Sequence, residues 1–374
     1  MDTPSGTATL QTAGTVRHGY WPLLRQSLNA HGIYLAIIAL YYAGFLTLVR
    51  LRPDLEPANF LLMALGFTAF SVPVMLIGLL FTRFYHIATV VKPERPIPAL
   101  LSDLKQYLTD RRRLAHGLPI VLTMVLFMYV FVELKAAIPV LNPFAWDETL
   151  VKWEAALHFG YQPWELLQPI FGYAPLTLLI NINYNAWFAV MWIVWVYFAF
   201  DTSASETRTR FFLTFFLAWI IGGGLMAIYF SSVGPCFYGP LGLSPDPFAA
   251  QMAYLRGVNE TFPLWAIEVQ DVLWAGYEGK SSIDGISALP SMHNGTALLF
   301  ALAGFKVSRR MGWVLAIHAA FIFIGSVHLA WHYAIDSYIA WALTLALWFG
   351  LGPVVRWWHG TATQQDFAAA LERA

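Results

Sequence analysis

The sequence SALPSMHNG at residues 287–295 and the sequence HYAID at residues 332–336 decide how this chain is interpreted. Both are short polar motifs beside strongly apolar segments. A histidine or carboxylate at the mouth of an apolar membrane segment is costly unless it is paired, and it usually marks function. We therefore expect the chemistry of this protein between Ser287 and Asp336.

The second motif has the spacing of a histidine with an orienting carboxylate. Helix positions four residues apart share one face, so Asp336 is expected to accept a hydrogen bond from one ring nitrogen of His332. The other nitrogen is then held as an outward-facing lone pair, which suits a base or a nucleophile. His293 is the expected partner that protonates the leaving group.

The first motif predicts an anion site. Pro290 interrupts the helix, and Ser291 stands where an N-cap or first-turn residue is expected, so the backbone amides of residues 291–294 would point at a bound anion. A phosphate fits this arrangement. We expect Ser291 and Asn294 to contact the substrate.

These residues carry a resemblance to a known family. The pattern Pro-Ser-x-His at residues 290–293, followed by His-x-x-x-Asp at residues 332–336, resembles two signature motifs of the type 2 phosphatidic acid phosphatase superfamily. The forms Pro-Ser-x-His-x-Gly and His-Tyr-x-x-Asp are most similar to the branch that contains inositol phosphorylceramide synthases. The resemblance implies that His332 attacks phosphorus to give a phosphohistidine, that Asp336 orients it, and that His293 protonates the leaving oxygen.

Two positions depart from the pattern of the phosphatases. These enzymes usually carry a Ser-Arg pair shortly before the final histidine, whereas this chain has Gly325 and Ser326 there. Their middle motif usually reads Pro-Ser-Gly-His, and here Met292 replaces the glycine. The resemblance therefore leaves open which residue supplies the positive charge at the phosphate.

The remaining motif of the family is also altered. It is a lysine some residues ahead of Arg-Pro, for which the sequence offers only Lys92 with Arg95 and Pro96. The orientation predicted below places these residues on the side of the membrane opposite to the histidines. In the synthase branch a proline- and aromatic-rich loop occupies this region, and the sequence GPCFYGP at residues 234–240 looks like such a loop, with Tyr238 as a candidate substrate contact. Lys280 is the first candidate for the missing cation, since a phosphoryl site needs positive charge or aimed amides.

The composition is that of a polytopic membrane protein. Hydrophobic residues make up 58% of the chain and charged residues 12%, there are 16 Trp, and the mean hydropathy is +0.57. We expect a lipid phosphate or phospholipid substrate, contact with membrane lipids, no nucleic acid, no cofactor or metal, and no obligate protein partner. The single cysteine, Cys236, cannot form an intrachain disulfide.

Apolar runs of about 20 residues, each long enough to cross ~30 Å of hydrocarbon, predict an all-α membrane bundle of about eight spans. The resemblance implies a six-helix core within it. Residues 1–30 are interpreted as a mobile or interfacial leader and residues 31–374 as one membrane domain, with the catalytic motifs in 232–340. The predicted spans are 32–49, 59–82, 117–139, 174–200, 211–231, 289–305, 312–330 and 334–352, the last two requiring a break at residues 328–333.

The positive charges predict the orientation. With eight spans both termini share a side, and the segments on that side hold sixteen of the 22 Lys and Arg residues. Positive charge concentrates in the cytoplasm, so both termini are expected there. His293, His332 and Asp336 then face the extracytoplasmic side.

The two long outer segments, 140–173 and 232–288, are candidate lids. Trp153 and Trp164 lie in one aromatic stretch with helical spacing, and Phe262 and Trp265 begin another. Amphipathic helices of this kind would lie in the interface plane and could guide a lipid to the site.

Two further function classes stay open. His328 and His332 have the spacing of a zinc pair, with Asp336 as a third ligand if one helix continued through them, which would suit an intramembrane hydrolase. A lipid transporter is the other class, although it should show inverted repeats or paired broken helices, and none is visible. Within the favoured class, the acceptor decides between a headgroup transferase and a lipid phosphate phosphatase acting on phosphatidic acid or a polyprenyl phosphate.

Overall fold

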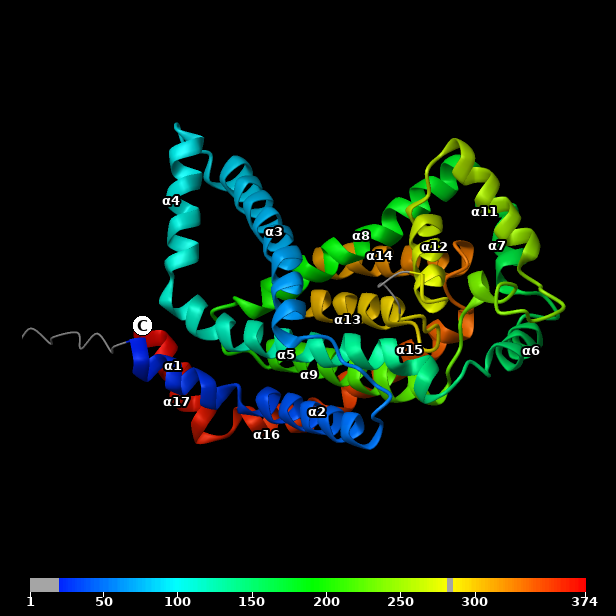
Figure 1. The fold of residues 1–374 in the computed structure, drawn as a ribbon. Coiled ribbons are helices and arrows are strands. Elements are labelled where there is room, and N and C mark those ends of the chain that lie inside the picture. The colour runs from blue at the N-terminus through cyan, green and yellow to red at the C-terminus, as the bar shows by residue number, and fades with distance from the viewer. Residues whose placement is uncertain (1–19, 281–284) are drawn as a thin grey trace, which may run out of the picture.

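The structure, a computed structural model, describes residues 20–280 and 285–374. In these two ranges the chain forms helices and no strands, which confirms the all-α class (Figure 1). The longer helices are α1 (Tyr20–Ala30), α2 (Gly32–Leu51), α3 (Phe60–His86), α4 (Pro96–Thr109), α5 (Arg111–Leu141), α6 (Asp147–Leu157), α7 (Pro163–Phe171), α8 (Ala174–Ala199), α9 (Glu206–Ala218), α11 (Ala249–Thr261), α12 (Trp265–Tyr277), α13 (Met292–Val307), α14 (Arg309–His328), α15 (Ala334–Gly350), α16 (Gly352–His359) and α17 (Ala362–Arg373).

The chain is a multi-pass membrane protein. Among the described residues, seven helical segments are long and apolar enough to span a membrane; these are Gly32–Leu51, Phe60–Val91, Arg111–Leu141, Ala174–Ala199, Glu206–Tyr229, Arg309–His328 and Ala334–His359. The predicted span 289–305 is not among them. Its helix, α13, begins only after Pro290 and has 16 residues, or about 24 Å. It lies in the middle of the bundle against α8, α9, α14 and α15, and most of its residues are buried (Figure 1).

The break that was expected at residues 328–333 is present. Helix α14 ends at His328 and α15 begins at Ala334. Ala330 has a left-handed backbone with φ of 59°. The backbone N–H groups of Trp331 and His332 both donate to the Ser326 carbonyl at 3.0 Å, which closes the turn. His332 is thereby held in a buried loop between two helices.

Helices α6, α7, α11 and α12 gather at the end of the bundle where α15 begins (Figure 1). The predicted continuous spacing from Trp153 to Trp164 is wrong as a single helix. Phe159 and Gly160 take left-handed conformations with φ of 59° and 94°, so α6 ends at Leu157 and α7 begins anew at Pro163. Similarly, Phe262 caps the C-terminus of α11, and α12 begins at Trp265.

The two terminal helices pack together at the other end of the bundle. Leu23 of α1 is buried with Ala115 of α5 and with Phe367 and Leu371 of α17. Residues 20–30, predicted as part of a mobile or interfacial leader, form a helix in this cluster, while residues 1–19 lie outside the described residues. Trp21 is 77% exposed, as expected for a residue near the membrane surface.

Candidate active site

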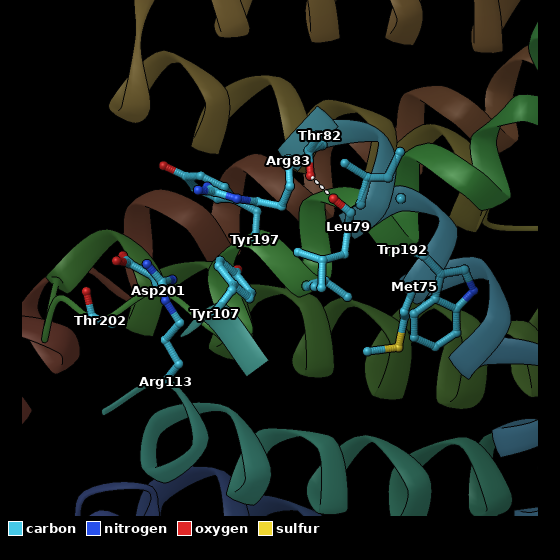
Figure 2. A pocket seen from close by; sticks show the side chains of 13 residues that line it. Met75, Leu79, Thr82, Arg83, Tyr107, Arg113, Trp192, Tyr197, Asp201 and Thr202 are labelled. Atoms are coloured by element: carbon cyan, nitrogen blue, oxygen red, sulfur yellow. Dashed lines mark hydrogen bonds between the residues drawn. The ribbon is translucent and has the colours of Figure 1, made fainter. Parts of the chain in front are cut away.

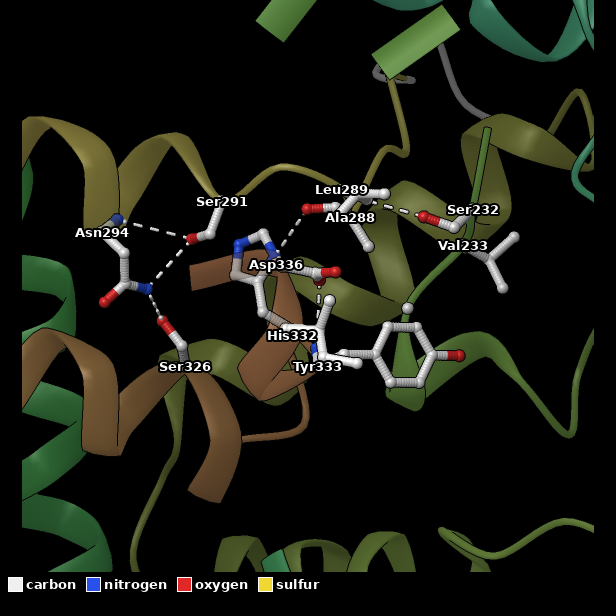
Figure 3. Close-up of polar contacts among 12 residues, drawn as sticks. Ser232, Val233, Ala288, Leu289, Ser291, Asn294, Ser326, His332, Tyr333 and Asp336 are labelled. Carbon is white, nitrogen blue, oxygen red and sulfur yellow. Dashed lines mark hydrogen bonds and ion pairs between the residues drawn. The ribbon is translucent and has the colours of Figure 1, made fainter. Parts of the chain in front are cut away.

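His332 has one ring nitrogen committed to hydrogen bonds. Its Nδ1 lies 2.9 Å from the Ala288 carbonyl oxygen and 3.2 Å from Oδ2 of Asp336 (Figure 3). Because a carbonyl oxygen only accepts, Nδ1 carries the proton and Nε2 keeps its lone pair. Burial, with a smaller contribution from the positive charge of Lys135, lowers the pKa of His332 to about 3. The ring is thus a neutral imidazole with a free Nε2.

Asp336 organises the loop as well as the ring. Its Oδ2 also accepts a hydrogen bond from the backbone N–H of Tyr333 at 3.0 Å, and its carbonyl accepts from the N–H of Ser291 at 3.1 Å. The predicted His332–Asp336 pair is therefore present. Its geometry differs from the expectation, because His332 precedes α15 and the two residues do not share a helix. Asp336 reaches back from the first turn of α15 instead.

The structure brings the two motif histidines together. The rings of His293 and His332 have centroids 6.0 Å apart. His293 lies in the first turn of α13 and packs against two aromatic rings of α8, with centroid distances of 4.9 Å to Tyr184 and 4.2 Å to Trp187. These contacts fix the ring beside His332. Neither Tyr184 nor Trp187 belongs to the motifs from which the sequence predicted the site.

Gly325 explains one of the departures from the family pattern. A Cβ atom at this position would lie 2.9 Å from Cδ2 of Tyr184, so the residue before Ser326 must be glycine for α14 to approach the ring that supports His293.

We expect Gly325→Ala to lower stability by about 1–3 kcal/mol through overpacking. Turnover should fall about 10- to 100-fold, because Tyr184 and His293 shift together. Gly66→Ala on α3 is the matched control, since nothing lies within 4 Å of its Cβ position. Thermal unfolding and turnover of both variants in detergent test this, and equal behaviour of the two would contradict it.

Met292, the second departure, fits a glycine-rich surface. Cβ atoms at Gly222 and Gly223, in the π-helical segment Trp219–Met226, would lie 3.2 Å from Sδ and Cγ of Met292, respectively. The side chain that replaces the family's glycine therefore occupies space that two other glycines leave free.

The predicted N-cap of α13 is confirmed. Oγ of Ser291 accepts from the N–H of Asn294 at 3.4 Å and from Nδ2 of Asn294 at 3.0 Å. Nδ2 of Asn294 also donates to Oγ of Ser326 at 2.7 Å, so Asn294 joins α13 to α14 (Figure 3). The backbone N–H groups of Met292 and His293 donate to none of the described residues. Those two amides are the part of the predicted anion site that stays available.

Lys135 of α5 is the candidate for the cation of this site. It acts electrostatically on both His293 and His332. Its stem packs beside Gly285, where an added Cβ would lie 3.4 Å from Cγ of Lys135. Lys280, the residue expected from the sequence, is exposed and pairs with Glu278 at 2.6 Å.

A sequence signal for Lys135 existed and was missed. Lys135 and Glu133 are the two charged residues in the apolar part of their span, and Lys135 precedes the dipeptide Asn142-Pro143. The family's first motif is a lysine some residues ahead of Arg-Pro, and Lys135 has this order with Asn142 in place of the arginine. A charged residue inside a span is a functional candidate by default.

The loop of residues 234–240 supports the segment around His332 rather than lining the site. Tyr238 is buried and packs against Phe248 at a centroid distance of 5.7 Å, and the structure does not bring it to the histidines. The N–H groups of Val233 and Gly234 donate to the carboxylate of Asp147 at 3.0–3.1 Å. Asp147 also accepts from the Tyr333 hydroxyl at 2.9 Å, so one buried carboxylate ties this loop to the residue after His332.

Glu154 is a second buried carboxylate that the sequence did not single out. Its Oε1 accepts from the backbone N–H of Ile335 at 2.8 Å and so caps α15 beside Asp336. Burial raises the pKa of Glu154 from 4.5 to about 7. The folded protein therefore favours the protonated carboxyl, and the stability that this preference contributes is complete below pH 4.5 and is lost as the pH rises through about 7.

We expect Glu154→Gln to stabilise the protein increasingly at high pH. Glutamine keeps an acceptor for Ile335 but carries no charge, so its advantage should grow from about pH 5 to about pH 8 by up to about 3 kcal/mol. Melting temperatures in detergent across this range test it. Glu148→Gln, at an exposed site on the same helix, should show no such trend, and a pH-independent difference for Glu154→Gln would refute the assignment.

The zinc alternative lacks a ligand set. Nε2 of His328 lies 2.9 Å from Oγ1 of Thr177, and its ring packs near Phe171 and Tyr254 rather than beside His332. In the described ranges, no three His, Cys, Asp or Glu residues are grouped so that they could hold a metal ion. His328 is a buried histidine that joins α14 to α8.

These features define a helical membrane protein with a buried, carboxylate-oriented histidine facing a second histidine and a lysine. The profile of the PAP2 superfamily matches residues 148–349, and the chain belongs to that superfamily. Its members are phosphoesterases or phosphotransferases. No curated protein and no solved structure was found to match the chain.

Proposed function

We propose that this protein transfers the phosphoryl-containing group of a membrane lipid through a phosphohistidine at His332. One observation carries the proposal. Ala288 and Asp336 hold Nδ1 of His332, so Nε2 is a free nucleophile beside His293, whose ring centroid is 6.0 Å away. Imidazole activated in this way is a competent covalent catalyst.

The first half-reaction forms the covalent intermediate. Nε2 of His332 attacks phosphorus, the bond from phosphorus to the leaving oxygen breaks, and His293 gives a proton to that oxygen. Burial lowers the pKa of His293, so the negative charge of the bound substrate must favour its protonated form. In the second half, neutral His293 takes the proton of an incoming hydroxyl, whose oxygen displaces Nε2 from phosphorus. Lys135 and the free amides of Met292 and His293 would stabilise the negative charge on the equatorial oxygens in both steps.

The site is proposed to face the extracytoplasmic side. Lys135 lies towards the C-terminal end of α5, whereas the arginine run of residues 111–113 begins that helix. Such runs mark the cytoplasmic side of a membrane. The described loops near the histidines carry few cations, which supports the same orientation.

For the finer assignment we propose a headgroup transferase similar to inositol phosphorylceramide synthases. The His332-Tyr333 form and the loop of residues 234–240 support this, because Asp147 joins both in one buried network. The second candidate is a lipid phosphate phosphatase, which would use the same residues with water as the acceptor.

A partition assay separates the two candidates. Purified protein in detergent with excess EDTA would receive phosphatidic acid, a polyprenyl phosphate or an inositol phospholipid, each with and without ceramide or diacylglycerol. A new phospholipid formed only with the alcohol would support the transferase. Release of free phosphate from the lipid phosphates would support the phosphatase, and no turnover of any of these lipids would contradict both.

A further inference from the structure

A cavity of about 420 Å³ lies between α3, α5 and α8, away from the histidines. Its walls include Met75 and Leu79 of α3 and Trp192 and Ile193 of α8, and its polar end includes Arg83, Tyr107 and Arg113 (Figure 2). The volume falls within the ~300–1,000 Å³ of typical ligand sites. Arg113 and Lys135 are separated along α5 by about 33 Å at a rise of ~1.5 Å per residue, so this cavity is distinct from the candidate active site.

The cavity lies where three membrane spans end. Arg83 is in the last turns of α3, Arg113 is in the first turn of α5, and Asp201 follows the end of α8. Its apolar walls belong to the spans themselves. A site with apolar walls in the hydrocarbon region and arginines at the boundary matches a lipid, which carries its charge at that same boundary.

Among the charged residues at the polar end, Arg113 is the one available to bind a phosphate. Arg83 donates two hydrogen bonds to the Asp103 carboxylate and is largely neutralised. Arg113 donates instead to the carbonyl of Phe200 at 2.9 Å, and the carboxylate of Asp110 is 4.0 Å from its Nε. Asp201, the acidic residue in the lining, uses both carboxylate oxygens on Ser203. Arg113 is therefore the cation whose charge is least offset.

Arg113 is also held in a fixed position. Its guanidinium stacks over the Tyr107 ring at 4.2 Å, and that of Arg83 lies 5.5 Å from the same ring. A stacked guanidinium keeps its edge donors in one plane, which suits a phosphate that accepts two parallel hydrogen bonds.

We propose that this cavity binds a phospholipid of the surrounding membrane, with its phosphate at Arg113 and one acyl chain along Met75, Trp192 and Ile193. The site stands apart from the proposed catalysis and holds whether the enzyme is a transferase or a phosphatase. It provides a second lipid contact, at the opposite end of the bundle from the histidines.

Native mass spectrometry of the delipidated full chain, titrated with phosphatidylglycerol, tests the site. The first lipid should bind at least about tenfold more tightly than later ones, and Arg113→Gln should remove that difference, because charge-assisted bonds to phosphate are lost. Arg112→Gln is the matched control. Arg112 directly precedes Arg113 in the arginine run and is absent from the lining of the cavity. Arg112→Gln should therefore bind the first lipid as tightly as the wild type.

A second variant tests the apolar walls. Val196→Trp fills the cavity and leaves both arginines in place, so it should also lose the first lipid. If Arg113→Gln does not fold, lipid binding by Val196→Trp tests the proposal on its own. Excess glycerol 3-phosphate should fail to displace the lipid, since the headgroup lacks the chain.

Three results would overturn the proposal. Equal losses of tight lipid binding in Arg113→Gln and Arg112→Gln would mean that general surface charge attracts the lipid. Unchanged binding in Val196→Trp would place the lipid elsewhere. Displacement by glycerol 3-phosphate would mean a site for a soluble phosphate.

Discussion

Replacing His332 by alanine should lower turnover of the lipid phosphoester by at least about 10⁴-fold, which is the scale seen when a covalent nucleophile is removed. The ring is 7% exposed, and its Nδ1 bonds leave Nε2 as the proposed attacking atom. The variant should also lose the ³²P label that the wild-type protein retains after brief exposure to labelled substrate, a label that acid should release and base should not.

His328→Ala is the matched control for this experiment. His328 is also buried, but its Nε2 serves Thr177. Its loss should reduce stability by about 1–3 kcal/mol through an unsatisfied partner and a cavity, with kcat little changed. If His332→Ala keeps its turnover or its acid-labile label, the phosphohistidine is excluded.

The described fold was largely predictable because long apolar runs have few alternatives in a membrane. The all-α class and the break at residues 328–333 follow directly from hydropathy and segment length. The short length and burial of α13 could not be predicted in this way, because its apolar run is surrounded by protein and its helix begins only after Pro290. The aromatic spacing predicted one continuous helix over residues 153–164, but the left-handed conformations of Phe159 and Gly160 end the helix within this stretch.

The candidate site was also predictable only in part. The pairing of His332 with Asp336 and the cap at Ser291 are local in sequence, and both were foreseen. Contacts between distant segments were not, such as the bonds of Asp147 to Gly234 and Tyr333 or the stacking of Tyr184 on His293. Such contacts depend on how the helices pack, which no short spacing encodes.

The second large expected effect on turnover concerns the cation that binds the phosphate. Lys135→Met should reduce turnover about 10²- to 10³-fold, as the loss of one donor to a developing oxyanion does. Lys280→Met should leave turnover unchanged, because Lys280 is exposed and paired with Glu278. Steady-state turnover of both variants measures the contrast, and the reverse ranking would return Lys280 to the site.

The stability of Lys135→Met should not fall with its turnover. This contrast separates a role of Lys135 in binding from a role in holding the fold. None of the ion pairs among the described residues includes Lys135. A charge held at membrane depth without a carboxylate costs free energy, so methionine of similar shape should keep or raise the melting temperature. A lysine retained at that cost is explained if a phosphate supplies the missing negative charge. Bound vanadate, as a phosphate mimic, should therefore stabilise the wild type more than Lys135→Met, and equal stabilisation would remove Lys135 from the phosphate site.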